Sequence, residues 1–437
     1  MLKFVKKHAW LFIIIFLLLL FPQSLTDQAK LNMRVIITGI GVDYIDNQYQ
    51  ITSQLVLPEN GTQSGGISAH ISYITATGQS ISECVQNTSY KLGKFTELSH
   101  IEFILVGETM KEHNLASSLD YFFRNFKLKK SVMLLTCFGQ AKDAIYKTSQ
   151  LELGVALSLQ KVYISHERSL NAVATTYIDF ISNSNSVSGT SVIDTFIITT
   201  DDENSSSTNS ASEGSEQSQG SSSQSSSSEA SQGASSTSGN SSQSESEQIN
   251  KSAKIKVNTP LIFFKNGLFS GKITDENAVW GYYFANKKSN NGNIFLTDFS
   301  YAEIANANIN IRIDQMNKTH KVEFVSGKPI QVINIKIKEA RIDEIAPINA
   351  ANTTIYKYLK PDVQNAILEG AKDKIKNLIN KTFTESQSQN FDIFKTADLC
   401  YKYHPEKWKN FIKNADNPNN YIQDVSVVVN VDFEQLS

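Results

Sequence analysis

The chain has 437 residues, a length that allows two or three domains, and its formal net charge is -2 at pH 7. This near balance of charge gives no reason to expect nucleic-acid binding, which normally shows a basic face. The three cysteines, Cys84, Cys137 and Cys400, are far apart and form no CxxC pair, which argues against a structural zinc site or a disulfide framework.

The amino terminus has the pattern of an export signal. Lys3, Lys6 and Lys7 precede the apolar run Ala9–Phe21. Basic residues before such a run predict that this end stays in the cytoplasm and that the rest of the chain lies outside. Neither a small-x-small cleavage site nor a cysteine stands close behind the run. We therefore expect residues 1–26 to remain as an uncleaved membrane anchor.

Residues 27–150 alternate between expected strands and helices, which predicts an amino-terminal domain of mixed type. Ser80 and Glu83 are spaced as a capping box, so a helix is expected to begin there. A second helix is expected from about Asn114, with an apolar side formed by Leu115, Leu119, Phe122, Phe123 and Phe126. Strands are expected at 34–43, 49–57, 71–76, 100–106 and 132–138, with a short helical turn at 141–146.

Residues 151–290 are expected to form a middle domain. Strands are predicted at 191–199 and 256–264, and the pair Asn266-Gly267 is typical of a turn after the second strand. Between these strands, residues 201–252 consist mostly of Ser with Gly, Gln, Glu and Asn, and contain no aromatic residue. Such a segment cannot bury enough apolar surface to offset the entropy of ordering, so we expect a disordered insertion.

Residues 291–437 give the clearest pattern. Isoleucines alternate with polar residues at 309–313 and 333–337, which is typical of half-buried antiparallel strands. Pro361 is expected to open a long helix with one apolar face, and 425–433 is a further alternating strand. The whole pattern predicts an α+β fold of three domains after the membrane segment, with an antiparallel sheet and a long helix in the last domain.

Motifs of catalysis or cofactor binding do not emerge. Gly39-Ile40-Gly41 lacks the third glycine of a dinucleotide loop, and the sequence contains no GxxxxGK[ST], HExxH or GxSxG. The 7 histidines are thinly spread, so a metal cluster is not expected. Asp392, Asp398 and His404 are interpreted as structural. We therefore expect no enzyme activity, no cofactor and no metal.

Six short segments occur in an order that resembles one known family. They are residues 38–43 (TGIGVD), 77–84 (TGQSISEC), 98–108 (LSHIEFILVGE), 119–125 (LDYFFRN), 262–271 (IFFKNGLFSG) and 392–408, which contains DIF, YHP and Trp408. Together they resemble the C subunits of GerA-type spore germinant receptors, the GerAC family. Two features depart from it, because no lipobox cysteine is present and the Ser-rich run falls between two strands of the middle domain.

This resemblance implies a three-domain protein on the outer face of the spore inner membrane. It would assemble with the membrane-spanning A and B subunits of a receptor, and the complex would bind a small-molecule nutrient. The resemblance supplies no catalytic residue and no cofactor. Two other classes remain open from the residues alone: an exported solute-binding or adhesion module unrelated to germination, and an exported hydrolase.

Four residues of the family-like segments are candidates for contact with a partner: Ser99, His100, Arg124 and Trp408. They are expected at the ends of strands and helices, where loops gather and partners can reach. Arginine and large aromatic residues also commonly anchor interfaces. The alternative is structural, with Trp408 as part of a core and Arg124 in an internal ion pair.

Overall fold

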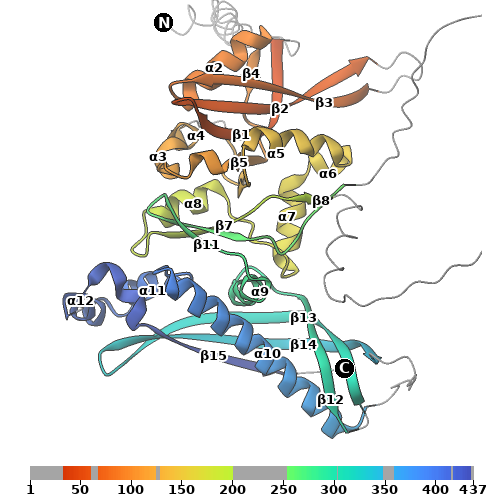
Figure 1. The fold of residues 1–437 in the computed structure, drawn as a ribbon, viewed down its shortest axis with the longest axis vertical. Coiled ribbons are helices and arrows are strands. Elements are labelled where there is room, and N and C mark those ends of the chain that lie inside the picture. The colour runs from red at the N-terminus through yellow and green to blue at the C-terminus, as the bar shows by residue number, and fades with distance from the viewer. Residues whose placement is uncertain are drawn as a thin grey trace, which may run out of the picture.

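The computed structural model describes residues 33–60, 67–124, 128–199, 253–302, 304–347, 359–414 and 417–434. The expected anchor (1–26) and the expected disordered insertion (201–252) lie outside these residues. The fold is α+β, as predicted, and its three larger sheets follow one another along the long axis of the molecule (Figure 1).

The first sheet has six strands. They are β1 (Arg34–Ile45), β2 (Gln48–Asn60), β3 (Ile67–Gly78), β4 (Phe95–Glu97), β5 (Phe103–Val106) and β6 (Met133–Thr136). The order is β3-β2-β1-β5-β6, and β4 pairs with the start of β1. Strands β1, β2 and β3 are antiparallel, whereas β1, β5 and β6 run parallel. The expected strand at 100–106 begins only at Phe103, because the residues before it form a loop.

The helices of this part begin close to where the sequence predicts. They are α2 (Ile81–Leu92), α3 (Leu115–Ser118), α4 (Asp120–Arg124) and α5 (Ala141–Lys147). The Ser80 hydroxyl accepts a hydrogen bond from the Glu83 N–H at 3.2 Å, but the Glu83 carboxylate accepts from the Gln79 N–H and not from Ser80 as the capping box would require. The predicted helix from Asn114 is broken at Leu119. Because the break shifts the helical phase, the Phe123 side chain is 52% exposed instead of buried. Phe126 is outside the described residues.

The middle part contains α6 (Leu153–Ala156), α7 (Leu159–Arg168), α8 (Tyr177–Ser184), β7 (Thr190–Asp194), β8 (Ile198–Thr199), β9 (Lys254–Ile255), β10 (Leu261–Lys265) and β11 (Leu268–Ile273). The sheet order is β11-β10-β7, with β8 and β9 as a separate antiparallel pair. Asn266 and Gly267 form the predicted turn, with φ of 52° and 81°. The predicted strand 191–199 is divided into β7 and β8, whereas the predicted strand 256–264 begins only at Leu261, as β10. The short strand β9 lies just before the predicted range, and its pairing with β8 places Thr199 directly opposite Lys254.

Strand β10 is buried on both faces. Leu261 and Phe263 belong to the core shared with the carboxy-terminal part, whereas Ile262 and Phe264 belong to the core shared with the amino-terminal part. The Phe263 ring stacks on Phe391 with centroids 4.2 Å apart. A strand covered on both faces needs an uninterrupted apolar sequence, which explains the run LIFF.

The last part contains α9 (Glu276–Ala285), β12 (Gly292–Tyr301), β13 (Ile304–Val325), β14 (Lys328–Pro347), α10 (Pro361–Ser388), α11 (Thr396–Tyr403), α12 (Pro405–Asn414) and β15 (Ser426–Phe433). Strands β13 and β14 are antiparallel, as predicted, and β12, which the sequence pattern does not predict, runs antiparallel to β13. Strand β15 runs parallel to β14, because α10, α11 and α12 form the crossover that returns the chain to the same edge of the sheet.

Helix α10 buries the face that its sequence predicts. The residues are Val363, Ile367, Ala371, Ile375, Leu378, Ile379 and Phe383. This face packs on β12 and β15, and the helix also contacts α9. At that contact a Cβ on Gly281 would lie 2.0 Å from the Leu378 carbonyl oxygen, so only glycine fits. The Thr382 hydroxyl donates to the Ala278 carbonyl at 2.6 Å, which ties the two helices together. The domain boundaries 27–150, 151–290 and 291–437 remain our proposal.

The first prediction tests the buried face of α10. Ile375 is fully buried and Asn377, two residues on, is exposed. Ile375→Asp should lower the free energy of unfolding by about 4 kcal/mol or more, since it places a carboxyl group among apolar neighbours. Asn377→Asp introduces the same group in water and should change it by less than about 0.5 kcal/mol. Urea unfolding of the full chain in detergent measures both, and equal losses would refute the face assignment.

The second prediction concerns the insertion. Because Thr199 and Lys254 are already paired, replacing residues 201–252 by Asn-Gly should leave the fold intact. A shorter loop should raise the free energy of unfolding by up to about 2 kcal/mol through lower closure entropy. A Gly/Ser segment of the original length is the control and should match the natural chain. Loss of the cooperative unfolding transition in the shortened chain alone would show that the insertion supports the fold.

Candidate interaction surface and buried polar joints

The family-like segment TGIGVD forms a tightly packed joint. A Cβ on Gly39 would lie 2.1 Å from the Phe103 ring, and one on Gly41 would lie 3.0 Å from the Ala141 carbonyl oxygen. Both glycines are therefore required by the close approach of β5 and α5 to β1. Their role is packing, and nothing in this geometry resembles a nucleotide-binding loop.

Asp43 completes this joint. Its carboxylate is fully buried and accepts hydrogen bonds from the Ala141 N–H at 2.8 Å, the Lys142 N–H at 2.9 Å and the Thr109 hydroxyl at 2.8 Å. The first two donors are at the amino end of α5, where a negative charge is favoured. A Cβ on Gly107 would lie 2.0 Å from the Asp43 carboxylate, so this glycine gives the carboxylate its room. The segments TGIGVD and LVGE thus meet at one capped helix.

Two more aspartates make joints around α11. The Asp392 carboxylate accepts from the Thr396 and Ala397 N–H groups at 2.8 and 2.9 Å and from the Tyr421 hydroxyl at 2.9 Å. Burial raises the pKa of Asp392 despite these donors. Asp398 accepts from the Ser188 N–H at 3.0 Å and its hydroxyl at 2.7 Å, which ties α11 to the loop before β7. These contacts agree with the structural interpretation of both residues.

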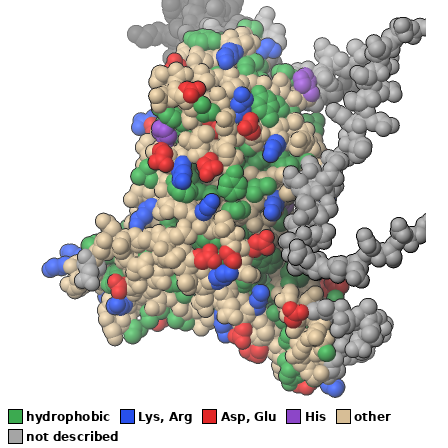
Figure 2. Space-filling view, in the orientation of Figure 1, with side chains coloured by type: hydrophobic (Ala, Val, Ile, Leu, Met, Phe, Trp, Pro, Cys, Tyr) green, Lys and Arg blue, Asp and Glu red, His purple; other side chains and the backbone are tan. Residues whose placement is uncertain are grey.

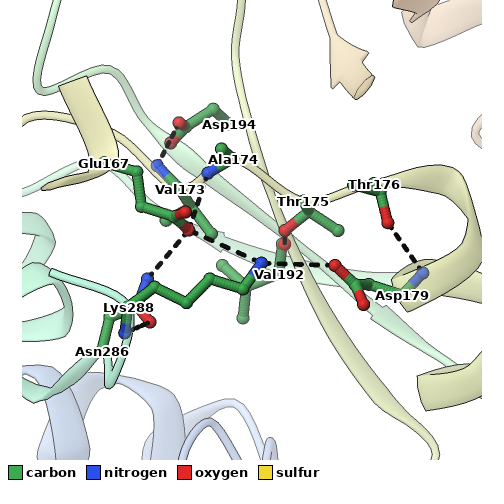
Figure 3. A network of polar contacts seen from close by, with 10 residues as sticks. All are labelled: Glu167, Val173, Ala174, Thr175, Thr176, Asp179, Val192, Asp194, Asn286 and Lys288. Atoms are coloured by element: carbon green, nitrogen blue, oxygen red, sulfur yellow. Dashed lines mark hydrogen bonds and ion pairs between the residues drawn. The ribbon is translucent and has the colours of Figure 1, made fainter. Parts of the chain in front are cut away.

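A larger polar network joins the middle part to the end of α9 (Figure 3). Glu167 accepts from the Ala174 N–H at 3.1 Å and the Asn286 amide at 3.3 Å, and its carboxylate is 3.9 Å from the Lys288 ammonium. Lys288 also pairs with Asp179 at 3.3 Å. Burial raises the pKa of Glu167. The network holds α7, α8 and the chain after α9 in fixed relation.

Asp194, at the end of β7, is the deepest carboxyl of this region. It accepts from the Val173 N–H and, at 3.3 Å, from the Tyr283 hydroxyl. Full burial raises the pKa of Asp194 well above its ordinary value. The neutral carboxyl is therefore favoured, and Asp194 acts as a hydrogen-bonding link between β7 and α9.

Two basic residues of β13 close the carboxyl end of α9. The Lys318 ammonium donates to the carbonyl oxygens of Tyr283 at 3.1 Å and Asn286 at 2.8 Å, and His320 Nε2 lies 2.9 Å from the Ala285 carbonyl oxygen. The helix end favours positive charge here, but burial lowers the pKa of Lys318 to about 7 and that of His320 to about 4.

The four predicted contact residues are not brought together. Ser99 and His100 lie in the loop between β4 and β5, where Ser99 is half-buried and His100 is exposed. Arg124, at the end of α4, has a 77% exposed side chain and pairs with Asp120, so its ion pair is on the surface. Trp408 belongs to α12, at the other end of the molecule from β4 (Figure 1).

Trp408 has the structural surroundings of the alternative interpretation. It is only 8% exposed, and its ring centroid is 5.2 Å from that of Tyr421 and 5.6 Å from that of Phe411. This leaves little of the indole for a partner. The role of Ser99, His100 and Arg124 as contact residues stays a prediction.

Within the described ranges no three His, Cys, Asp or Glu side chains are placed to share a metal ion. No helix in this part of the chain is long and apolar enough to cross a membrane. The three cysteines are buried and unpaired, and burial raises the pKa of Cys84 to about 11 and those of Cys137 and Cys400 to about 12. All three thiols therefore stay protonated at neutral pH.

Two family models match in the order that the sequence predicts. The spore germination protein N-terminal domain matches residues 27–198, and the spore germination B3/GerAC-like C-terminal domain matches residues 261–434. Together they cover most of the chain. The chain therefore belongs to the GerAC-like family of spore germination proteins, the C subunits of germinant receptors, which confirms the resemblance.

Two relatives come from Bacillus subtilis (strain 168). Spore germination protein B3 is 28% identical over 143 residues, which is 32% of this chain and 38% of that protein. The putative spore germination protein YfkR is 24% identical over 153 residues, which is 34% of this chain and 40% of that protein. The matched stretch thus spans well under half of each relative. The crystal structure of the GerBC protein aligns at 14% identity and a TM-score of 0.48, covering 91% of this chain and 96% of that one.

The third prediction follows from Lys318. Its pKa is about 7 in the folded chain and about 10.5 when unfolded, so between these values the unfolded chain binds the additional proton. The free energy of unfolding should therefore fall as pH drops from 10.5 to 7, by up to about 1.4 kcal/mol per pH unit, and level off below 7.

Lys318→Met removes this titration, so the slope between pH 7.5 and 9.5 should become shallower. Lys409→Met, at an exposed lysine of α12, should leave the slope unchanged. Urea unfolding at several pH values measures these slopes. An equal slope in the natural chain and Lys318→Met would contradict the lowered pKa.

Proposed function

We propose that this chain is the C subunit of a nutrient germinant receptor, held on the outer face of the spore inner membrane. It assembles with the membrane-spanning A and B subunits and acts by contact, not by turnover of a substrate. The observation that carries the proposal is the match of both family models, in order, over most of the chain.

Action by contact is supported by what the perturbed groups do. Asp194, Glu167 and Lys318 have pKa values shifted by burial, and such groups often mark catalytic sites. Here each one bonds to the backbone or side chains of another part of the chain. These bonds fix α9 against the middle sheet. The three groups therefore stabilise a rigid protein, whose surfaces are available to partners.

The proposed orientation is supported by the surface around the start of β1. Tyr90 is 70% exposed and Phe95 61% exposed, and Met33 and Ile36 are exposed as well. Phe95 is the register partner of Arg34 at the first residue of β1. Figure 2 shows hydrophobic side chains at this end, next to basic ones. Aromatic and basic side chains together favour a membrane interface, so we propose that this end faces the bilayer.

The fourth prediction tests the assembly. Tagged full-length chain, purified from detergent-solubilised spore membranes, should recover the A and B subunits. Arg124→Ala should reduce that recovery several-fold with no loss of unfolding free energy, since its ion pair is exposed. Arg312→Ala is the matched control, because Arg312 is also exposed and paired with a neighbouring aspartate, Asp314, on β13.

Trp408→Ala distinguishes the structural alternative. It should cost about 3 kcal/mol or more of unfolding free energy and lose the partners only through loss of the fold. If natural chain recovers neither subunit while both are present in the membranes, the proposed receptor role is wrong. Equal recovery by Arg124→Ala and Arg312→Ala would remove Arg124 from the contact surface.

A further inference from the structure

A hollow of about 100 Å³, partly open to solvent, lies where the first sheet meets the middle sheet. Its floor begins at Val106 and Thr136, the last residues of the parallel strands β5 and β6. The opposite wall comes from β10 and β11. In open α/β sheets, ligands commonly bind beyond the carboxyl ends of parallel strands, and the parallel part of this mixed sheet has the same kind of edge here. None of the four contact candidates lines this hollow.

The wall is mainly apolar. It is formed by Val106, Met110, Phe138, Ile262, Phe264 and Phe269. The polar groups beneath it are already bonded inside the protein: the Thr136 hydroxyl donates to the Asp194 carbonyl at 3.0 Å, and the Thr195 hydroxyl donates to the Pro260 carbonyl at 2.8 Å. An apolar group can therefore fill the hollow without leaving these hydroxyls unpaired.

Two lysines stand at its edge. The Lys111 ammonium is 4.9 Å from the centroid of the Phe269 ring, and the Lys272 ammonium is 5.8 Å from that of Phe138. Both are exposed, and both lie over rings that line the hollow. The one acidic lining residue, Glu108, accepts a hydrogen bond from the Gly139 N–H at 3.3 Å. The ionisable lining groups thus leave one net positive charge.

We infer that this hollow binds a small organic monocarboxylate with an apolar body. The apolar part packs among Met110, Phe264 and Phe269, while the carboxylate meets the ammonium groups of Lys111 and Lys272. An apolar lining with a few charged groups at the edge is the usual composition of small-molecule sites. The inference extends the proposed receptor role, since it would give this subunit a ligand of its own.

Charge complementarity decides the ligand class. A cationic ligand with the same apolar body would meet two ammonium groups against a single carboxylate that is already hydrogen-bonded. A neutral one would gain only the apolar contacts. A carboxylate accepts charge-assisted hydrogen bonds from lysines, which are stronger than those between neutral groups.

The fifth prediction uses 4-(4-fluorophenyl)butyrate as the probe. Fluorine NMR of full-length chain in nanodiscs should show saturable binding at millimolar probe or below, beyond the partition into empty nanodiscs. The double variant Lys111→Met, Lys272→Met keeps the apolar stems and should weaken binding about tenfold. The same double variant should leave binding of the neutral 4-(4-fluorophenyl)butan-1-ol unchanged.

Lys409→Met is the matched control, because it removes one exposed ammonium on α12, a helix that contributes no residue to the lining of the hollow. It should bind the probe as the natural chain does. Absence of saturable binding by the natural chain would overturn the inference, as would equal binding of the corresponding butylamine. Since the subunit is titrated alone, these outcomes are independent of whether the A and B subunits are recovered from membranes.

Discussion

The burial of β10 on both of its faces is the constraint on which the arrangement of this protein depends. Alternate side chains of one five-residue strand enter two different hydrophobic cores, with Ile262 and Phe264 on one side and Leu261 and Phe263 on the other. Each fully buried side chain of this size contributes about 2 kcal/mol or more to stability. Because the two cores share this strand, they cannot move independently without exposing it. The molecule is therefore one rigid, elongated body and not a set of domains joined by flexible linkers.

Buried polar contacts determine how the elements of this rigid body are oriented against one another. Hydrophobic contact alone is non-directional, so it does not fix how α9 is rotated against the middle sheet. Asp194, Glu167 and Lys318 fix it, because each has bonds that only one arrangement satisfies. Burying such groups is costly, and the cost is offset only when their partners are in place. A wrongly docked α9 would leave these groups unpaired.

Regular patterns in the sequence were sufficient for much of the fold. The buried face of α10 agrees with the single apolar face that the sequence predicts, because a long helix repeats its period many times and one core covers it. The direction of β15 was not accessible, since alternation shows which face is buried but not which way a strand runs. Phe123 was misplaced because the break at Leu119 shifts the helical phase, and short helices give little warning of such breaks.

The candidate site was harder to predict. Lys318 and His320 had a usable signal, because they are in phase with Val322 and Phe324 on the inward side of β13, after the irregularity at Gln315. A polar residue at an inward-facing position of a strand needs a hydrogen-bond partner inside the protein. The partners, however, are carbonyl oxygens at the carboxyl end of α9, and single-sequence periodicity carries no information on such distant contacts. The hollow beside Lys272 could not be predicted from the sequence for the same reason, since its two walls belong to different sheets.

The pairing of Thr199 with Lys254 has a mechanical consequence. Whatever sequence connects these residues leaves and re-enters the molecule at a single point, on neighbouring strands. A pull on that connection is borne by one short strand pair, and it does not pry the two cores apart. The same geometry makes this position suitable for grafting a reporter protein whose own termini are close together. A fluorescent domain placed there would allow the subunit to be followed in living spores while its termini remain unaltered.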